Sequence, residues 1–247
     1  MTMDLERGAL LWISSFGFVS SFVIRISTLL DEQNQGHDHK MKRIATPHIA
    51  LLIGVAIVFI WSGINPHDRL TWCLEVFPGV IGLIVLAATY RRFQFTTLVY
   101  TLIAIHICIL CVGGHWTYAH EPVFNWFKEV FHWSRNHYDR LGHFAQGFVP
   151  ALIAREMFIR LNILNRKRWQ PFLIISICLA ISVTYEFIEW WSALIGGAAS
   201  TEFLGTQGDI WDTQEDMFMC LVGATFALLF MRSWQDRQLC KLGSLAE

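Results

Sequence analysis

The stretch TPHIALLIGVAIVFIWSG (residues 46–63) decides the fold class, because it runs for 18 residues without a single charged side chain. A helix of about 20 mainly apolar residues is long enough to cross the hydrocarbon core of a lipid bilayer. This stretch therefore predicts a membrane-spanning helix, and the rest of the chain can be compared with it.

Similar apolar segments recur along the chain, at 71–90, 95–113, 141–159, 170–193 and 215–231. A further segment, 9–30, places Ser14, Ser21, Arg25 and Thr28 at helical spacing, so one stripe of it is polar. Such a helix either packs as a span or lies flat in the membrane interface. The fold prediction is an all-α, polytopic transmembrane helix bundle with six spans, and a seventh if 9–30 crosses the bilayer.

The composition of the 247-residue chain agrees with this class, since 54% of its residues are hydrophobic and only 16% are charged. Soluble domains carry about 25% charged residues. The net charge of −1 and the lack of a basic stripe exclude a nucleic-acid partner, and the lipid bilayer is the expected one. Cys108 and Cys111 form a CxxC spacing inside an apolar run, where core packing is the expected role.

Basic residues alternate between the loops, which predicts the orientation. They precede the first span, follow the second and fourth, and follow the last, while the loop at 194–214 has none. The positive-inside rule then places the basic loops and the C-terminus in the cytoplasm. Three segments are placed outside: 64–70, 114–140 and 194–214. The domain prediction is an N-terminal extension (1–44), a membrane bundle (45–232) and a cytoplasmic tail (233–247).

With this orientation, ionisable residues from three distant segments approach the outer face. Residues three or four apart share one face of a helix, so each segment can direct its acids at the other two. Ionisable groups at this depth are costly and usually face a protein interior or a wet cavity. We expect one common site, formed by Asp139, Arg140, His143, Glu186, Glu189, Asp209, Asp212 and Asp216.

Three acidic faces repel one another unless protons, cationic side chains or a metal ion compensate them. Carboxylates whose pKa values differ can act as acid and base, so the candidate catalytic residues are Asp139, His143, Glu186, Glu189, Asp212 and Asp216. A divalent metal that activates water is the cofactor this set could hold, with His143, Glu189, Asp212 and Asp216 as its predicted ligands.

A substrate site is expected beside these acids. Arg140 or Arg155 could hold a phosphate in a bidentate grip. The loop GTQGDIWDTQ (205–214) could fold into the mouth of the site, which adds Gln207 and Asp209 to the substrate-binding set. The amphipathic stretch VFNWFKEVFHWSRN (123–136) is expected to form a helix on the outer surface.

Structural roles are the alternative for individual residues. Asp139 and Asp212 stand where helices begin and could cap free N–H groups. Glu156 could form structural ion pairs with Arg155 and Arg160. For the whole chain, two functions stand beside a membrane enzyme. A proton-coupled transporter requires a polar path to the cytoplasmic side, and a structural or accessory protein requires every acid to be paired.

Four motifs carry a family resemblance: GGHWTYA (113–119), RNHYDRLGHFAQGFVPALIARE (135–156), YEFIEW (185–190) and FLGTQGDIWDTQEDM (203–217). They resemble the bacterial YjdF-like inner-membrane proteins over roughly residues 45–232, which implies a multi-pass protein of the bacterial inner membrane. The order D-R-x-x-H-F, a glutamate-bearing helix, then D-x-x-x-D is similar to that in VanZ-like membrane proteins. Neither family supplies a reaction, so the expected substrate class, a lipid-linked or small envelope molecule, rests on the predicted location.

Overall fold

The computed structural model describes residues 46–196, 203 and 205–243. The predicted extension 1–44, with its candidate helix at 9–30, lies outside the described residues. Within the described ranges all regular secondary structure is helical, which confirms the all-α class.

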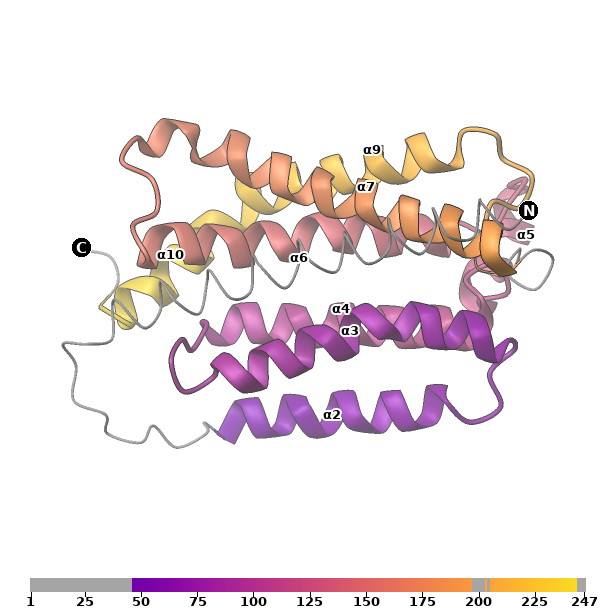
Figure 1. The fold of residues 1–247 in the computed structure, drawn as a ribbon, viewed down its shortest axis with the longest axis horizontal. Coiled ribbons are helices and arrows are strands. Elements are labelled where there is room, and N and C mark those ends of the chain that lie inside the picture. The colour runs from indigo at the N-terminus through magenta and orange to yellow at the C-terminus, as the bar shows by residue number, and fades with distance from the viewer. Residues whose placement is uncertain (1–45, 197–202, 204, 244–247) are drawn as a thin grey trace.

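The long helices run alongside one another, with successive helices joined at alternate ends (Figure 1). A short 3-10 turn, η1 (Lys167–Trp169), precedes α7, and a π-helical turn, η3 (Ala227–Met231), joins α9 to α10. The helices are α2 (Thr46–Ser62), α3 (Arg69–Thr89), α4 (Thr97–Trp116), α5 (Pro122–Phe131), α6 (Tyr138–Arg160), α7 (Gln170–Gly196), α9 (Asp212–Phe226) and α10 (Arg232–Lys241).

Four helical segments are long and apolar enough to cross a membrane: Arg69–Thr89, Thr97–Trp116, Lys167–Ile195 and Asp212–Lys241. Helix α2 is equally apolar but has only 17 residues. Helix α6 has 23 residues, yet five of them are charged, so its composition is less apolar than that of the others. All six predicted segments are thus helical, and four of them meet the criteria for a span by length and composition.

Helix α6 is the centre of the bundle, since it packs against α4, α7 and α9. Its closest approach is to α9, where glycines face backbone. A Cβ atom on Gly147 would collide with the carbonyl oxygen of Cys220, and one on Gly223 would collide with that of Phe144. Small residues let membrane helices approach this closely. The contact therefore determines the register of α6 on α9.

Polar contacts close the end of the bundle where α6 finishes. The Glu156 carboxylate is fully buried and accepts hydrogen bonds from the Thr96 backbone N–H (2.9 Å) and hydroxyl (2.8 Å). It also pairs with Arg160 at 2.9 Å. The structural role considered for Glu156 and Arg160 is therefore the one observed.

Arg155 lies at this same end. It donates to Gln235 Oε1 (2.8 Å) and to Asp236 Oδ1 (2.6 Å) on α10. Gln235 and Leu239 are fully buried. The segment predicted as a tail from 233 onward thus begins as a packed helix.

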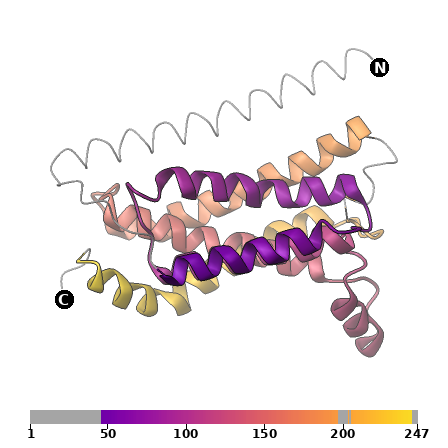
Figure 2. The same cartoon turned by 90° about the horizontal axis from the view of Figure 1, so that it is seen from below.

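Helix α5 projects crosswise from the opposite end of the bundle (Figure 2). Within the described part of the chain none of its residues is buried. It exposes Val123, Trp126, Val130 and Phe131. This arrangement agrees with the predicted amphipathic surface helix.

The α6–α9 contact generates a stability prediction. Replacing Gly147 by alanine forces a Cβ into the α9 backbone and should lower the free energy of unfolding by about 1–3 kcal/mol. Gly82→Ala is the matched control, because a Cβ there meets no atom within 4 Å. Thermal unfolding of the detergent-solubilised variants checks this. Equal melting temperatures for the two variants would contradict the close packing.

Candidate metal centre

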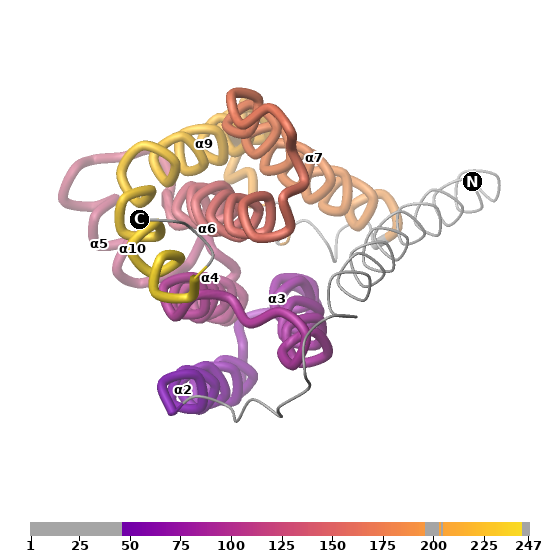
Figure 3. Tube along the Cα trace, turned by 90° about the vertical axis from the view of Figure 1, so that its left-hand side faces the viewer, coloured from indigo at the N-terminus to yellow at the C-terminus, as the bar shows by residue number. Residues whose placement is uncertain are grey.

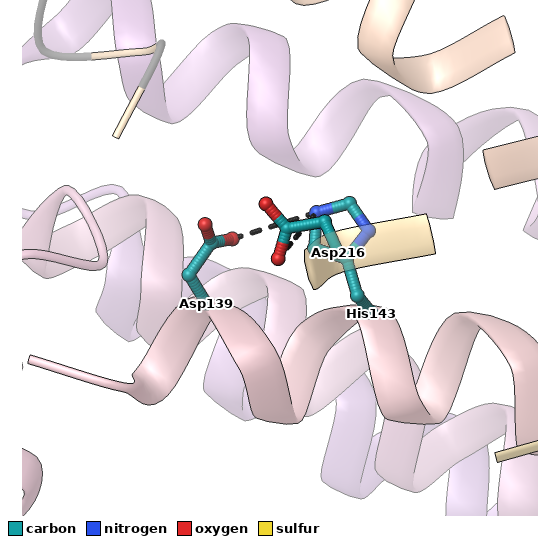
Figure 4. Close-up of side chains that lie close together, drawn as sticks. All are labelled: Asp139, His143 and Asp216. Atoms are coloured by element: carbon teal, nitrogen blue, oxygen red, sulfur yellow. Dashed lines mark ion pairs between the residues drawn. The ribbon is translucent and has the colours of Figure 1, made fainter. Parts of the chain in front are cut away.

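The predicted acids meet where the first turns of α6 and α9 lie beside α7. Asp139 and His143 extend from α6 towards Asp216 of α9 (Figure 4). Glu186 comes from α7. All four side chains belong to buried residues, with exposed fractions between 1% and 9%. The convergence expected from the sequence is therefore present.

His143 is the central side chain of this group. Its Nε2 atom lies 3.6 Å from Asp139 Oδ1, 3.7 Å from Glu186 Oε1 and 3.8 Å from Asp216 Oδ1. Its Nδ1 atom lies 3.1 Å from the Gln146 amide oxygen. A neutral imidazole that donates from Nδ1 to Gln146 presents the Nε2 lone pair to the three carboxylates. Metal-binding histidines are held in this way by a partner on their second nitrogen.

The spacing suits a metal ion. One ligand atom from each of Asp139, His143 and Asp216 lies within 4.8 Å of the others. Ligands at about 2.0–2.2 Å from one ion lie about 3–3.5 Å apart, so a modest inward movement completes the set. Glu186 Oε1 is buried and has no hydrogen-bond partner among the residues that the structure describes. It is available as a fourth ligand.

Arg140 links the two helices that carry this group. Its Nη1 atom contacts Asp216 and lies 3.1 Å from Asp212 Oδ1. Its Nη2 atom lies 2.8 Å from Glu215 Oε2 and 3.3 Å from Asp209 Oδ2. The guanidinium fork from α6 thus bridges four acids in and before the first turns of α9, an arrangement to which its rigid geometry is suited.

Arg135 reinforces the same bridge from the segment before α6. Its Nη1 atom contacts Asp212 and lies 3.2 Å from Asp209 Oδ2, and its Nη2 atom lies 3.8 Å from Asp139 Oδ2. It also donates to the Gly205 carbonyl oxygen at 3.2 Å. Asp212 is therefore shared by two arginines.

The loop before α9 is held by its own polar side chains. Gln207 accepts from the Asn136 N–H and donates to the Asn136 carbonyl oxygen, both at 2.9 Å. Gly205 and Gly208 adopt the left-handed conformation that this tight path requires. The Trp211 N–H donates to Asp209, and this bond, followed by Arg135, lowers the pKa of Asp209.

The cluster contains more buried carboxyl groups than buried guanidinium groups. Besides Glu121, which caps α5, six buried carboxyl groups stand at this end against the two buried guanidinium groups of Arg135 and Arg140, counting only residues that the structure describes. Glu189 interacts electrostatically with four of the other carboxyls, and Glu75 is bonded to the Tyr185 hydroxyl at 2.7 Å. The six, termed the carboxylate cluster below, are Glu75, Asp139, Glu186, Glu189, Asp212 and Asp216.

Some predicted roles shift in the structure. Asp212 and Glu189 were expected to bind metal with His143 and Asp216, but among the described residues the group with metal-ligand spacing is Asp139, His143 and Asp216. Asp212 contacts both arginines instead. Arg155 was expected near the acids, but it lies at the opposite end with Gln235. Neither α6 nor α9 begins with a side-chain cap, so Asp139 and Asp212 do not act as capping residues.

The residues of the site that were not predicted include Arg135, Glu75 and Tyr185, together with Gln146 beside His143 and Glu215 beside Arg140. Arg135 stands four residues before Asp139, and that spacing was a readable signal of an ion pair. Glu75 is the one acid inside the 71–90 apolar run, and a charged group within a span usually has a function. Tyr185, beside Glu186 in the sequence, had no distinctive signal.

Taken together, the fold and the site define a polytopic α-helical membrane protein with a buried histidine–carboxylate centre at one end. The chain belongs to the family described as "Predicted membrane protein (DUF2238)", which matches residues 47–237. It is 48% identical over 189 residues to the inner membrane protein YjdF of Escherichia coli (strain K12), covering 76% of this chain and 90% of that protein. No solved structure matches. The resemblance read from the four motifs is thus confirmed.

The arginine bridge generates a second prediction. Arg140→Gln leaves buried carboxylates without their cation and should lower the free energy of unfolding by about 3–5 kcal/mol. The free energy of unfolding of Arg140→Lys should lie between those of the wild type and Arg140→Gln, because lysine keeps the charge but lacks the planar guanidinium group. Arg232→Gln is the control, since that side chain is 69% exposed. Chemical denaturation in detergent measures the free energy of unfolding of the three variants. An Arg140→Gln denaturation curve that matches that of Arg232→Gln would contradict a stabilising role for the arginine bridge.

Proposed function

We propose that this inner-membrane protein binds one divalent metal ion and uses it for hydrolysis at the outer membrane face. The ligands in this proposal are His143, Asp139, Asp216 and Glu186. The observation that carries it is the position of His143 Nε2, within 3.6–3.8 Å of three carboxylate oxygens that come from three helices.

Charge favours a metal at this position. The carboxylate cluster has six acids, and the buried arginines beside it are Arg135 and Arg140. Any of these acids that is ionised is costly without a compensating cation. A divalent cation offsets two charges at once. One imidazole and several carboxylates suit zinc or manganese, because both accept mixed nitrogen and oxygen ligands.

The ligand type favours chemistry over a structural role. Structural zinc sites are usually built from cysteine and histidine, whereas hydrolytic sites use histidine and carboxylate and keep a position for water. A metal at this site would lower the pKa of its bound water. Glu189, one turn after Glu186 on α7, supplies a further carboxylate to take the proton.

The surroundings indicate where a substrate approaches. Next to the acids, Ile210 and Trp211 are 84% and 60% exposed, and the apolar residues of α5 project from the same end. An amphipathic helix lying across the spans is suited to the headgroup region of a bilayer. The basic loops favour this end as the outer one, with six spans and a cytoplasmic C-terminus. The substrate class in this proposal is therefore a lipid-linked molecule of the outer leaflet.

Metal binding is tested on the purified full-length protein after loading with zinc or manganese. We expect about one ion per chain in the wild type and a loss of at least tenfold in affinity for His143→Ala, because the central ligand is gone. Gln146→Ala should weaken affinity about 10–100-fold by freeing the imidazole. His132→Ala, an exposed histidine on the same protein, is the control. Equal metal content in all four proteins would remove the proposal.

Hydrolysis needs a separate readout. The metal-loaded protein is incubated with a total lipid extract of bacterial envelopes, and lipid products are followed by mass spectrometry. Glu189→Gln should keep the metal and lose product formation. A site that binds metal yet yields no product with any lipid would be structural.

One observation favours a second candidate, a proton-coupled carrier. The cluster reaches α3 at Glu75, which accepts a hydrogen bond from Tyr185 of α7, and His106, midway along α4, interacts electrostatically with His143. Proton relays in transporters use such chains. Proton flux into vesicles that contain the wild-type protein, and its loss in Glu75→Gln, would favour the carrier. No proton flux with the wild-type protein would favour the enzyme.

A further inference from the structure

A groove lies between α2, α3 and α4, away from the carboxylate cluster. Helices α2 and α3 flank α4 (Figure 3), and both pack on it. Between them lies a groove of about 570 Å³. Its walls are apolar side chains of all three helices, among them Leu51, Val55, Leu83, Ala87, Ile103 and Ile107.

The polar side chains of this groove are all at one end. His48 stands at the start of α2, Tyr90 and Arg91 at the end of α3, and Tyr100 at the start of α4. The His48 Nδ1 atom lies 2.8 Å from the Tyr90 hydroxyl, and its ring lies 4.4 Å from that of Tyr100. The groove is therefore amphiphilic, with a polar mouth and an apolar interior.

The length of the groove suits part of an acyl chain. From His48 to Val55, and from Tyr100 to Ile107, the lining covers eight residues of helix, a rise of about 10 Å. That is roughly a third of the hydrocarbon thickness of a bilayer. The groove can therefore hold the part of one acyl chain that is nearest to the headgroup, with the headgroup beside the mouth.

The charge at the mouth determines which headgroup fits. Arg91 is exposed there and can grip a phosphate with two N–H groups. Arg92 follows it in the sequence. Basic residues at a membrane surface favour anionic lipids by about 1 kcal/mol each.

We propose that this groove binds one acyl chain of an anionic phospholipid, whose phosphate lies at Arg91 above the His48, Tyr90 and Tyr100 side chains. The site is separate from the metal centre. The charge at the mouth selects the headgroup of the lipid. The apolar walls contact the acyl chain without selecting its chemical type.

The test counts lipids bound to the detergent-solubilised full-length protein by native mass spectrometry, with dioleoyl phosphatidylglycerol and dioleoyl phosphatidylcholine as probes. Wild-type protein should prefer phosphatidylglycerol. Arg91→Gln should lower its affinity about fivefold and leave that for phosphatidylcholine unchanged, since one basic contact is lost.

The groove itself is tested by a matched pair on α3. Ala87→Trp fills the groove, whereas Ala88→Trp places the same side chain on the next residue, which is exposed and does not line it. We expect Ala87→Trp alone to lose phosphatidylglycerol binding. Leu83→Phe is the second filling variant if Ala87→Trp melts early.

Two results would overturn the proposal: no preference for phosphatidylglycerol in the wild type, or equal binding by Ala87→Trp and Ala88→Trp. Metal content should be unchanged in every groove variant. A negative result for lipid binding therefore does not affect the metal proposal, and a negative result for metal binding does not affect the lipid proposal.

Discussion

The requirement that shapes this molecule is compensation of acidic groups buried inside a membrane bundle. Carboxylates removed from water are tolerated only with cations, protons or hydrogen-bond donors beside them. Arg140 and Arg135 meet part of this requirement by joining the start of α6 to the start of α9. Because Gly147 and Gly223 let the same helices touch, the bridge and the packing support one another.

The two arginines do not compensate every acid of the carboxylate cluster. The acids that they leave include Glu186, beside His143. Asp212 is held by both guanidinium groups, whereas Asp139, Asp216 and Glu186 surround an imidazole, and of these three Asp216 also contacts Arg140. Glu186 keeps a buried oxygen without a hydrogen-bond partner in the described part of the chain. Arg135 Nε, within the arginine bridge, is likewise buried without a partner among the described residues, so both halves of the cluster keep an unused polar atom.

The two ends of the bundle use polar residues differently. At the end where α6 finishes, Glu156 and Arg155 are paired with backbone and side-chain groups of neighbouring segments, so they tie α4 and α10 to α6. At the other end, acids exceed their partners. This asymmetry separates Arg155, which is paired with Gln235 and Asp236, from Arg140, which contacts the acids at the start of α9.

The amino-acid sequence by itself determined the helical class, the six helical segments and the meeting of Asp139, His143, Glu186 and Asp216, because apolar runs set helix length and helical spacing sets the face. It could not assign partners. Whether Asp212 or Asp139 stands beside His143, and which acids each arginine contacts, depends on the rotation and crossing of α6 on α9. Only the tertiary structure decided these points, since the packing of Gly147 and Gly223 sets that rotation and has no signature in hydropathy.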